Sequence, residues 1–205
     1  MKISHLAMNL RGPWMITPEM ASAMVPILKG VLSGYITEFD KGPEPQKMSL
    51  DTLIPAPTGK QHQFAGKSIY VTNLSGTILK YDSCEAYGTT TLGRKLLEAD
   101  ADPDVIGHII ITESGGGAAN AVPEIAEAIQ GCEKPVVAWI DGIAASAAIY
   151  SVSYCDRIIA HRESDIVGSV GTLIEISGMP LYHKDPESGM VTARIYADAS
   201  TDKNA

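Results

Sequence analysis

The sequence predicts an α/β fold with parallel strands, and three observations support it. Between residues 107 and 171, short apolar segments typical of strands alternate with segments of helical periodicity. The strand-like runs GHIIITES and PVVAWID are continuously apolar, which favours strands covered on both faces. Each of these runs leads into glycine or alanine, residues suited to a tight turn from a strand into a helix.

Composition and charge narrow the class of protein. The chain has 205 residues, enough for one domain with a sizeable core, and 45% of them are hydrophobic. A net charge of −8 argues against a nucleic-acid or anionic-membrane partner. No stretch reaches the roughly 20 apolar residues of a membrane span, and the N-terminus lacks a signal-peptide core. The three cysteines show no metal-ligand spacing, and their odd number without a signal peptide predicts reduced thiols in the cytoplasm. We expect neither a metal nor a cofactor.

The N-terminal part is predicted to lie outside the main domain. Residues 17–33 begin with Thr17-Pro18 and carry an apolar stripe at helical spacing, formed by Met20, Met24, Ile27, Leu28 and Val31. This helix is expected to cover a core or an oligomer contact, with a docking role as the alternative. Four prolines between residues 41 and 60 indicate an extended linker. We therefore expect a helical arm over 1–40, a Pro-rich linker over 41–66 and a domain over 67–205, truncated at its C-terminus.

The domain is predicted to repeat a strand–loop–helix order. SIYVTNLSGTILKY is expected to form two short strands around a turn at Ser75-Gly76. The helices expected after it are TTTLGRKLLEAD, VPEIAEAIQGC and the small-residue segment AASAAIYSVSYC. The strands expected are GHIIITES, PVVAWID, DRIIAH, TLIEIS and TARIYAD.

A glycine run follows the strand GHIIITE at residues 114–117, where open α/β folds place ligand sites. Successive glycines let backbone N–H groups converge into a nest that can hold a developing oxyanion. A plain flexible turn is the alternative. Phosphate binding is disfavoured, because neither GxxxxGK[ST] nor a well-spaced GxGxxG is present.

Ser146 stands in DGIAASAAIYS, at the expected junction of a strand and a helix. Its alanine neighbours permit close approach of another backbone or of a substrate chain. In isolation, a serine at this place is also well explained as an N-cap.

Taken in order, these segments resemble the signal peptide peptidase A family of Ser–Lys proteases. In that family a strand ends in Ser-Pro-Gly-Gly, and Lys-Pro-Val-Val-Ala follows a helix. The nucleophile motif Gly-x-Ala-Ala-Ser-Gly-Gly-Tyr-Tyr then precedes Ala-Asp-x-Ile-x-Ala and Gly-Ser-Ile-Gly. The matching segments here, within roughly residues 68–205, are ESGGG, KPVVAWIDG, IAASAAIY, YCDRIIA and GSVG. The resemblance implies a Clp/crotonase-type superhelix of ββα units with parallel strands.

The resemblance also implies roles for residues of this chain. Ser146 would be the nucleophile, Lys203 the general base and Ser169 the residue that orients the base. The oxyanion hole would be formed by the backbone N–H groups of Gly116 and Ala147, with Gly115 and Gly117 in the substrate-binding segment. Two departures from the pattern are that Gly115 replaces the usual proline, and that Ala147 and Ala148 replace two glycines.

The identity of the base has alternatives. Histidine is the usual base for a serine nucleophile, and His161 is the histidine with some prospect of reaching Ser146. Lys203, in STDK after the last expected strand, matches the place of the family's general base. To act, its amine must be neutral and therefore desolvated. The alternative for Lys203 is a solvated tail residue.

The expected function is endoproteolysis through an acyl-enzyme at Ser146. GPWMITPEM and the tail STDKNA resemble phage and prophage members, which degrade scaffold or process capsid precursors during head assembly. The expected partners are a polypeptide substrate and further copies of the chain, in the host cytoplasm or procapsid, with no membrane anchor. The alternatives are a cellular peptidase of signal-peptide remnants, a crotonase-like acyl-CoA enzyme and an inactive assembly module.

Overall fold

The computed structural model describes residues 14–16, 25–26, 29–30, 33, 42–54, 63–83, 86–177 and 192–199. Its largest element is a six-stranded sheet. The path β2-β3-β4-β6-β7 contains five of the strands, and β8 pairs with the far end of β6. These strands are β2 (Gln46–Ser49), β3 (Ser68–Ser75), β4 (Val105–Ser114), β6 (Val136–Ala145), β7 (Arg157–Ala160) and β8 (Ile166–Gly168).

Most neighbours in this sheet are parallel. β3 pairs with β4, β4 with β6, and β6 with both β7 and β8, all in parallel register. β2 is antiparallel to β3 and forms the edge of the path. The predicted α/β fold with parallel strands is confirmed.

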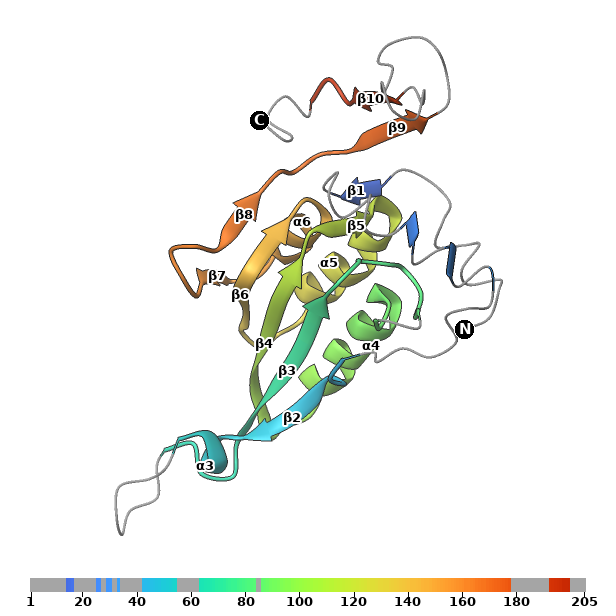
Figure 1. The fold of residues 1–205 in the computed structure, drawn as a ribbon. Helices are drawn as coiled ribbons and strands as arrows, with labels where there is room; N and C mark the ends of the chain where they lie inside the picture. Colours follow the sequence, from blue (N-terminus) through green and yellow to red (C-terminus); the bar gives the residue numbers. More distant parts are fainter. Residues whose placement is uncertain are drawn as a thin grey trace.

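Three helices cover one face of the sheet (Figure 1). They are α4 (Thr89–Asp100), α5 (Val122–Gly131) and α6 (Ala147–Val152), and a short helix, α3 (Leu50–Leu53), follows β2. The core between helices and sheet contains Leu92, Leu96, Ile110, Ile125 and Ile140, each at most 1% exposed. Burying side chains of this size contributes about 1.5–3 kcal/mol each, which fixes the helix layer on this face.

The second face of the sheet is more exposed than the sequence predicted. Along β4, Ile110 and Thr112 are buried, whereas Ile109 and Ile111 on the opposite face are half-buried. All four residues of β7 are exposed. The expectation that the strands are covered on both faces is therefore wrong for the described residues, because α4, α5 and α6 all pack on the same side.

A second, four-stranded sheet lies beyond the carboxyl ends of the parallel strands, at the top of Figure 1. Its order is β10-β9-β1-β5. The four strands are β1 (Trp14–Ile16), β5 (Gly116–Ala118), β9 (Leu173–Ser177) and β10 (Thr192–Tyr196). Strands from both ends of the chain are thus brought together with the glycine segment that follows β4.

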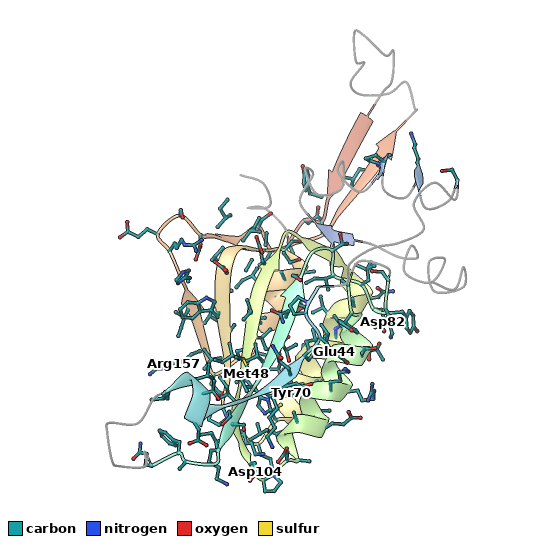
Figure 2. The ribbon with its side chains drawn as sticks, turned by 60° about the horizontal axis from the view of Figure 1, so that its bottom comes forward. Glu44, Met48, Tyr70, Asp82, Asp104 and Arg157 are labelled. Atoms are coloured by element: carbon teal, nitrogen blue, oxygen red, sulfur yellow. The ribbon has the colours of Figure 1, made fainter. Side chains whose placement is uncertain are left out.

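Two segments differ from their expected structure. Residues 46–49, inside the expected linker, form β2, and Figure 2 shows Glu44 and Met48 along this edge beside Tyr70 of β3. The expected turn at Ser75-Gly76 ends β3, but the chain beyond it does not return as a hairpin. Instead Ile78 forms a parallel bridge with Gly117. The turn residues suggested that the chain would pair back on β3. It pairs instead with the glycine segment, which is distant in the sequence.

Several expected elements are confirmed, and one lies mostly outside the description. The helix TTTLGRKLLEAD spans Thr89–Asp100, and TLIEIS and TARIYAD contain the strands β9 and β10. Residues 25–26 and 29–30 are helical. The stripe Met20, Met24, Ile27, Leu28 and Val31 lies outside the described residues.

Candidate active site

The ends of two adjacent parallel strands bring the glycine segment and Ser146 together. Ser114, the last residue of β4, is in register with Ala144 of β6. Gly115 and Ala145 follow directly, so both loops leave the sheet side by side. A register shift between Thr112 and Ser114 makes room for Gly142, which has φ 102°. Such a bulge re-aims the strand beyond it, and from Ile143 onward β6 pairs with β8 rather than β7.

Ser146 itself has a strained backbone. It lies between β6 and α6 with φ 57° and ψ −115°, in the left-handed half of the map that non-glycine residues rarely occupy. Such a conformation costs on the order of 1–3 kcal/mol and persists only where the surroundings impose it. A serine held on a sharp strand-to-helix turn presents its hydroxyl to one side of the sheet, as nucleophilic serines of other folds do.

The surroundings of Ser146 are the loop with the sequence GSVG. The Ser146 N–H donates to the Gly168 carbonyl at 2.9 Å. Its hydroxyl donates to the Gly171 carbonyl at 3.3 Å. None of the N–H groups of α6 donates a capping hydrogen bond to this hydroxyl, so the alternative of a side-chain N-cap is not what the structure shows.

Small buried side chains pack on either side of Ser146. Ala144, Ala145, Ala147 and Ala148 are each at most 1% exposed, and Ser146 is 0% exposed. Ala147 packs with Val122 and Ala126 of α5. Larger residues here would push α6 away from the sheet, so the alanines allow the tight turn that holds the serine.

The glycine segment is a strand rather than a flexible turn. Gly116–Ala118 form β5, which is fully buried and pairs with β1. Ser114 anchors it from below: its hydroxyl donates to the Gly76 carbonyl at 2.5 Å and accepts the Gly116 N–H at 3.1 Å. The Gly116 N–H, to which the family resemblance gives a role in the oxyanion hole, is thus bound to a side chain in this state.

Gly117 is required by close packing. The Ile78 N–H donates to the Gly116 carbonyl at 3.0 Å, and the Ala118 N–H donates to the Ile78 carbonyl at 2.8 Å. A Cβ on Gly117 would come within 2.0 Å of the Ile78 carbonyl oxygen, so no other residue fits. Because alternate residues of a strand direct their N–H and C=O groups to opposite edges, those of Gly117 face away from Ile78.

The structure brings together the predicted site residues that it describes. Ser146, Ala147, Ser169 and the glycine segment 115–117 surround the upper ends of β4 and β6. Ser169 has φ 53° and lies beside Gly168, whose carbonyl binds Ser146. Lys203 lies outside the described residues. The competing base, His161, is exposed and stacks on Trp139 with ring centroids 4.8 Å apart.

Sequence reasoning missed three contributors to this geometry. Ser114 orders the glycine segment through its hydroxyl, and Ile78 supports that segment from a distant part of the chain. The pairing of residues 14–16 with β5 had no sequence signal, because a strand of three residues is too short to show an alternating pattern, and nothing in it indicates which strand it pairs with. The serine directly before the glycine run was the one available hint.

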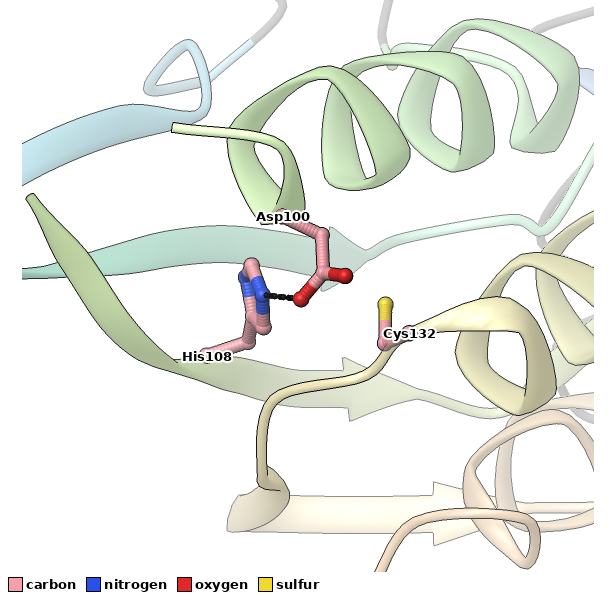
Figure 3. Close-up of side chains that lie close together, drawn as sticks. All are labelled: Asp100, His108 and Cys132. Atoms are coloured by element: carbon pink, nitrogen blue, oxygen red, sulfur yellow. Dashed lines mark hydrogen bonds and ion pairs between the residues drawn. The ribbon is translucent and has the colours of Figure 1, made fainter. Parts of the chain in front are cut away.

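A separate polar cluster lies at the opposite end of the sheet (Figure 3). The Asp100 carboxylate accepts the Nε2–H of His108 at 2.9 Å and the N–H groups of Glu133 and Lys134 at 2.9 and 3.2 Å. Burial lowers the pKa of His108, outweighing the opposing effect of Asp100. Burial also raises the pKa of Cys132 to about 11. The cluster therefore joins the end of α4 to β4 and to the turn after α5.

Asp100, His108 and Cys132 present ligand atoms within 4.8 Å of one another, the spacing of a candidate metal site. Their chemistry does not favour one. The carboxylate already accepts three hydrogen bonds, and a thiol with a raised pKa gives up its proton reluctantly. A structural role for this cluster agrees better with its hydrogen bonds.

The lowered pKa of His108 predicts a pH-dependent stability. The unfolded chain takes up a proton on this histidine near pH 6.5, whereas the folded chain resists it. Folding stability should therefore fall as pH decreases through about 6.5. We expect the urea midpoint of His108→Gln to fall less between pH 7.5 and 5.5 than that of the wild type. Equal falls in the two proteins would contradict this assignment.

Comparison with known proteins gives the following similarities. No family model matches the chain. The chain is 34% identical over 125 residues to Protease 4 of Haemophilus influenzae, which covers 59% of this chain. The match spans only 20% of that protein, so the chain corresponds to about a fifth of its length.

Solved structures with some similarity include a mutant of a membrane-bound stomatin-specific protease, 1510-N. The matched region covers 60% of this chain and 53% of the 1510-N chain, with 18% identity and a TM-score of 0.40. An enoyl-CoA hydratase from Polaromonas sp. JS666 covers 48% and 46%, with 18% identity and a TM-score of 0.39. Among the described residues, no helix has the length and apolar character to span a membrane.

The sequence match to Protease 4 extends over more than half of this chain's own length.

Proposed function

We propose that this protein is a serine endopeptidase with Ser146 as its nucleophile. The observation that carries the proposal is the placement of Ser146: a strained backbone, a hydroxyl bonded to the loop 168–171, and the glycine strand β5 on the adjacent strand end. The similarity to Protease 4 and the resemblance to signal peptide peptidase A proteases support the same reading.

In the proposed reaction the neutral amine of Lys203 takes the proton of the Ser146 hydroxyl while Oγ attacks the carbonyl carbon of the scissile peptide bond. Ser169 orients that amine. The resulting oxyanion is bound by the N–H groups of Ala147 and Gly116, the first of which has no partner within its helix because it opens α6. The lysine returns its proton to the leaving amine, and water then hydrolyses the acyl-enzyme by the same route.

The Gly116 donor requires a local change before it can serve. Its N–H is bound to the Ser114 hydroxyl at 3.1 Å, and that hydroxyl has the Gly76 carbonyl as its own acceptor. A large rotation of the peptide group between Gly115 and Gly116, which glycine tolerates, would be needed to turn this N–H from the Ile78 edge of β5 toward Ser146. Substrate binding along β5 would supply the free energy for that rotation.

The polypeptide substrate would bind as an added strand beside β5. The N–H and C=O of Gly117 face the edge that leads toward Ser146, and main-chain hydrogen bonds to such an edge accept many sequences. Scaffold or capsid precursors of a phage head are the proposed substrates, supported by the resemblance of GPWMITPEM and STDKNA to phage members.

We further propose that the chain assembles with copies of itself. Five apolar residues along β7, β8 and the following loop are exposed by 39–62%: Ile158, Ile159, Ile166, Val167 and Val170. Exposed apolar groups gathered on one edge are typical of protein interfaces. A neighbouring copy would also desolvate Lys203, whose amine must lose its proton to act as a base at neutral pH.

A degradation assay separates the proposed function from the acyl-CoA alternative. We expect the purified chain to cut an unfolded protein such as reduced casein into discrete fragments, and to leave a medium-chain acyl-CoA thioester unchanged. A crotonase-like enzyme would bind the thioester and leave casein intact. Absence of both activities, in a preparation shown to be folded, would favour an inactive assembly module.

A further inference from the structure

The space between β5 and β9, which we call the slot, lies beside Ser146, and each of the two strands is connected to the surroundings of this serine. β5 continues the strand end that adjoins Ser146, since Ser114 and Ala144 are in register. β9 continues the loop that binds Ser146, since the hydroxyl donates to the Gly171 carbonyl two residues before Leu173. An extended chain lying between these two strands would therefore pass Ser146.

That slot is occupied by the protein's own N-terminal segment. β1 lies between β5 and β9 and is antiparallel to both, with Trp14 opposite Ala118 on one side and Leu173 on the other. Met15 is opposite Gly117. Because the N–H and C=O of Gly117 face away from Ile78, they face Met15, and residues in this relation exchange both hydrogen bonds.

The direction of β1 follows from its register with both neighbouring strands. Its register with β5 runs from Trp14 opposite Ala118 to Ile16 opposite Gly116. Continuing its register with β9 by two residues sets Ile16 opposite Gly171, whose carbonyl accepts the Ser146 hydroxyl. The segment thus runs toward Ser146 in the N-to-C direction.

We infer that residues 14–16 are an intramolecular plug, an extended stretch of the arm that fills the peptide slot and must leave before a polypeptide substrate can bind. This inference rests on the proposed function, because it takes the slot as the place of the substrate. The plug makes the site self-limiting. A substrate must compete with a segment of the same chain that is present at high effective concentration. The apparent affinity of the protein for substrate is therefore reduced in proportion to the fraction of molecules in which the slot is open.

The test removes one backbone N–H from the plug. Met15→Pro lacks the donor that faces Gly117 and cannot pair at a central strand position. Met15→Ala is the matched control, because it shortens the same side chain and keeps both backbone groups. The probe is a fluorescein-labelled peptide with the sequence RGPWMIT, residues 11–17 of this chain. Its binding is followed by fluorescence anisotropy in a Ser146→Ala background, so that no hydrolysis intervenes.

We expect the peptide to bind the Met15→Pro protein at least about tenfold more tightly than the wild type, with Met15→Ala close to the wild type. A peptide with proline in place of its methionine should bind none of the three. Equal peptide affinity in all three proteins would contradict the inference that residues 14–16 fill the slot. Because binding is measured without catalysis, this outcome is independent of whether Ser146 is a nucleophile.

Hydrogen exchange on the chain without a substitution at Met15 tests the plug independently, in case the Met15→Pro variant does not fold. Excess unlabelled RGPWMIT should speed amide exchange over residues 14–16 and leave the amides of 116–118 protected, since one strand replaces another. If exchange over 14–16 does not change while the peptide binds, the segment does not occupy the slot and the inference is wrong.

Discussion

Ser146→Ala is expected to abolish peptide hydrolysis, with a loss of about 10⁴-fold or more in kcat. The substitution removes the one oxygen that attacks the substrate, and leaves the backbone and the packing of the neighbouring alanines in place. The measurement is the rate of casein fragmentation by the purified variant. Turnover near the wild-type rate would rule out Ser146 as the nucleophile.

A second substitution at the same position tests whether the strain is real. Ser146→Gly is equally inactive but has no Cβ, so it adopts φ 57° and ψ −115° freely. We expect Ser146→Gly to exceed Ser146→Ala in free energy of unfolding by about 1 kcal/mol, the lower end of the usual cost of such a conformation. Urea denaturation of the two variants measures this difference. An alanine variant more stable than the glycine variant would mean that the turn at Ser146 is relaxed.

Lys203→Ala is expected to lower kcat by about 10²–10⁴-fold, the usual contribution of a general base. A lysine in water keeps a pKa of roughly 10.4 and would be protonated at neutral pH. The base must therefore be buried, and we propose that a neighbouring copy of the chain covers it and that it meets Ser146 across the interface. Since the neutral amine alone accepts a proton, we expect activity to rise with pH if Lys203 is the base.

Mixing two inactive variants tests the shared site. Ser146→Ala and Lys203→Ala chains, combined under conditions that allow subunit exchange, should regain part of the wild-type activity, because mixed assemblies contain intact Ser–Lys pairs. Sedimentation first tests whether the chain assembles, and a tag on one variant reports whether exchange has occurred. If exchange is complete and the mixture stays inactive, serine and lysine belong to the same chain.

The parts of the fold that sequence predicted best are those with local signals. The helix Thr89–Asp100 has its leucines at helical spacing, and the strands β4 and β6 are long apolar runs. For these elements the information lies within a dozen neighbouring residues. Ser146 could be singled out because IAASAAIY is one of an ordered set of segments that resemble the signal peptide peptidase A family.

The features that could not be predicted depend on distant partners. Gly116–Ala118 form a strand because Ile78 and residues 14–16 flank them, and neither partner has a local signal. Residues 46–49 join the sheet although prolines precede and follow them, since the edge of β3 offers them hydrogen bonds. The positive φ of Ser146 likewise follows from its bonds to the loop 168–171, more than 20 residues away in sequence.

The most direct test of the central claim is the site at which a serine-directed fluorophosphonate reacts. The reagent forms a covalent adduct with a serine only where a base activates the hydroxyl and an oxyanion hole accepts the phosphoryl oxygen. We predict one adduct per chain, located by tandem mass spectrometry on Ser146, and none after Ser146→Ala. A folded chain that gives no adduct, or an adduct on another serine that survives Ser146→Ala, would contradict the assignment of Ser146 as an activated nucleophile.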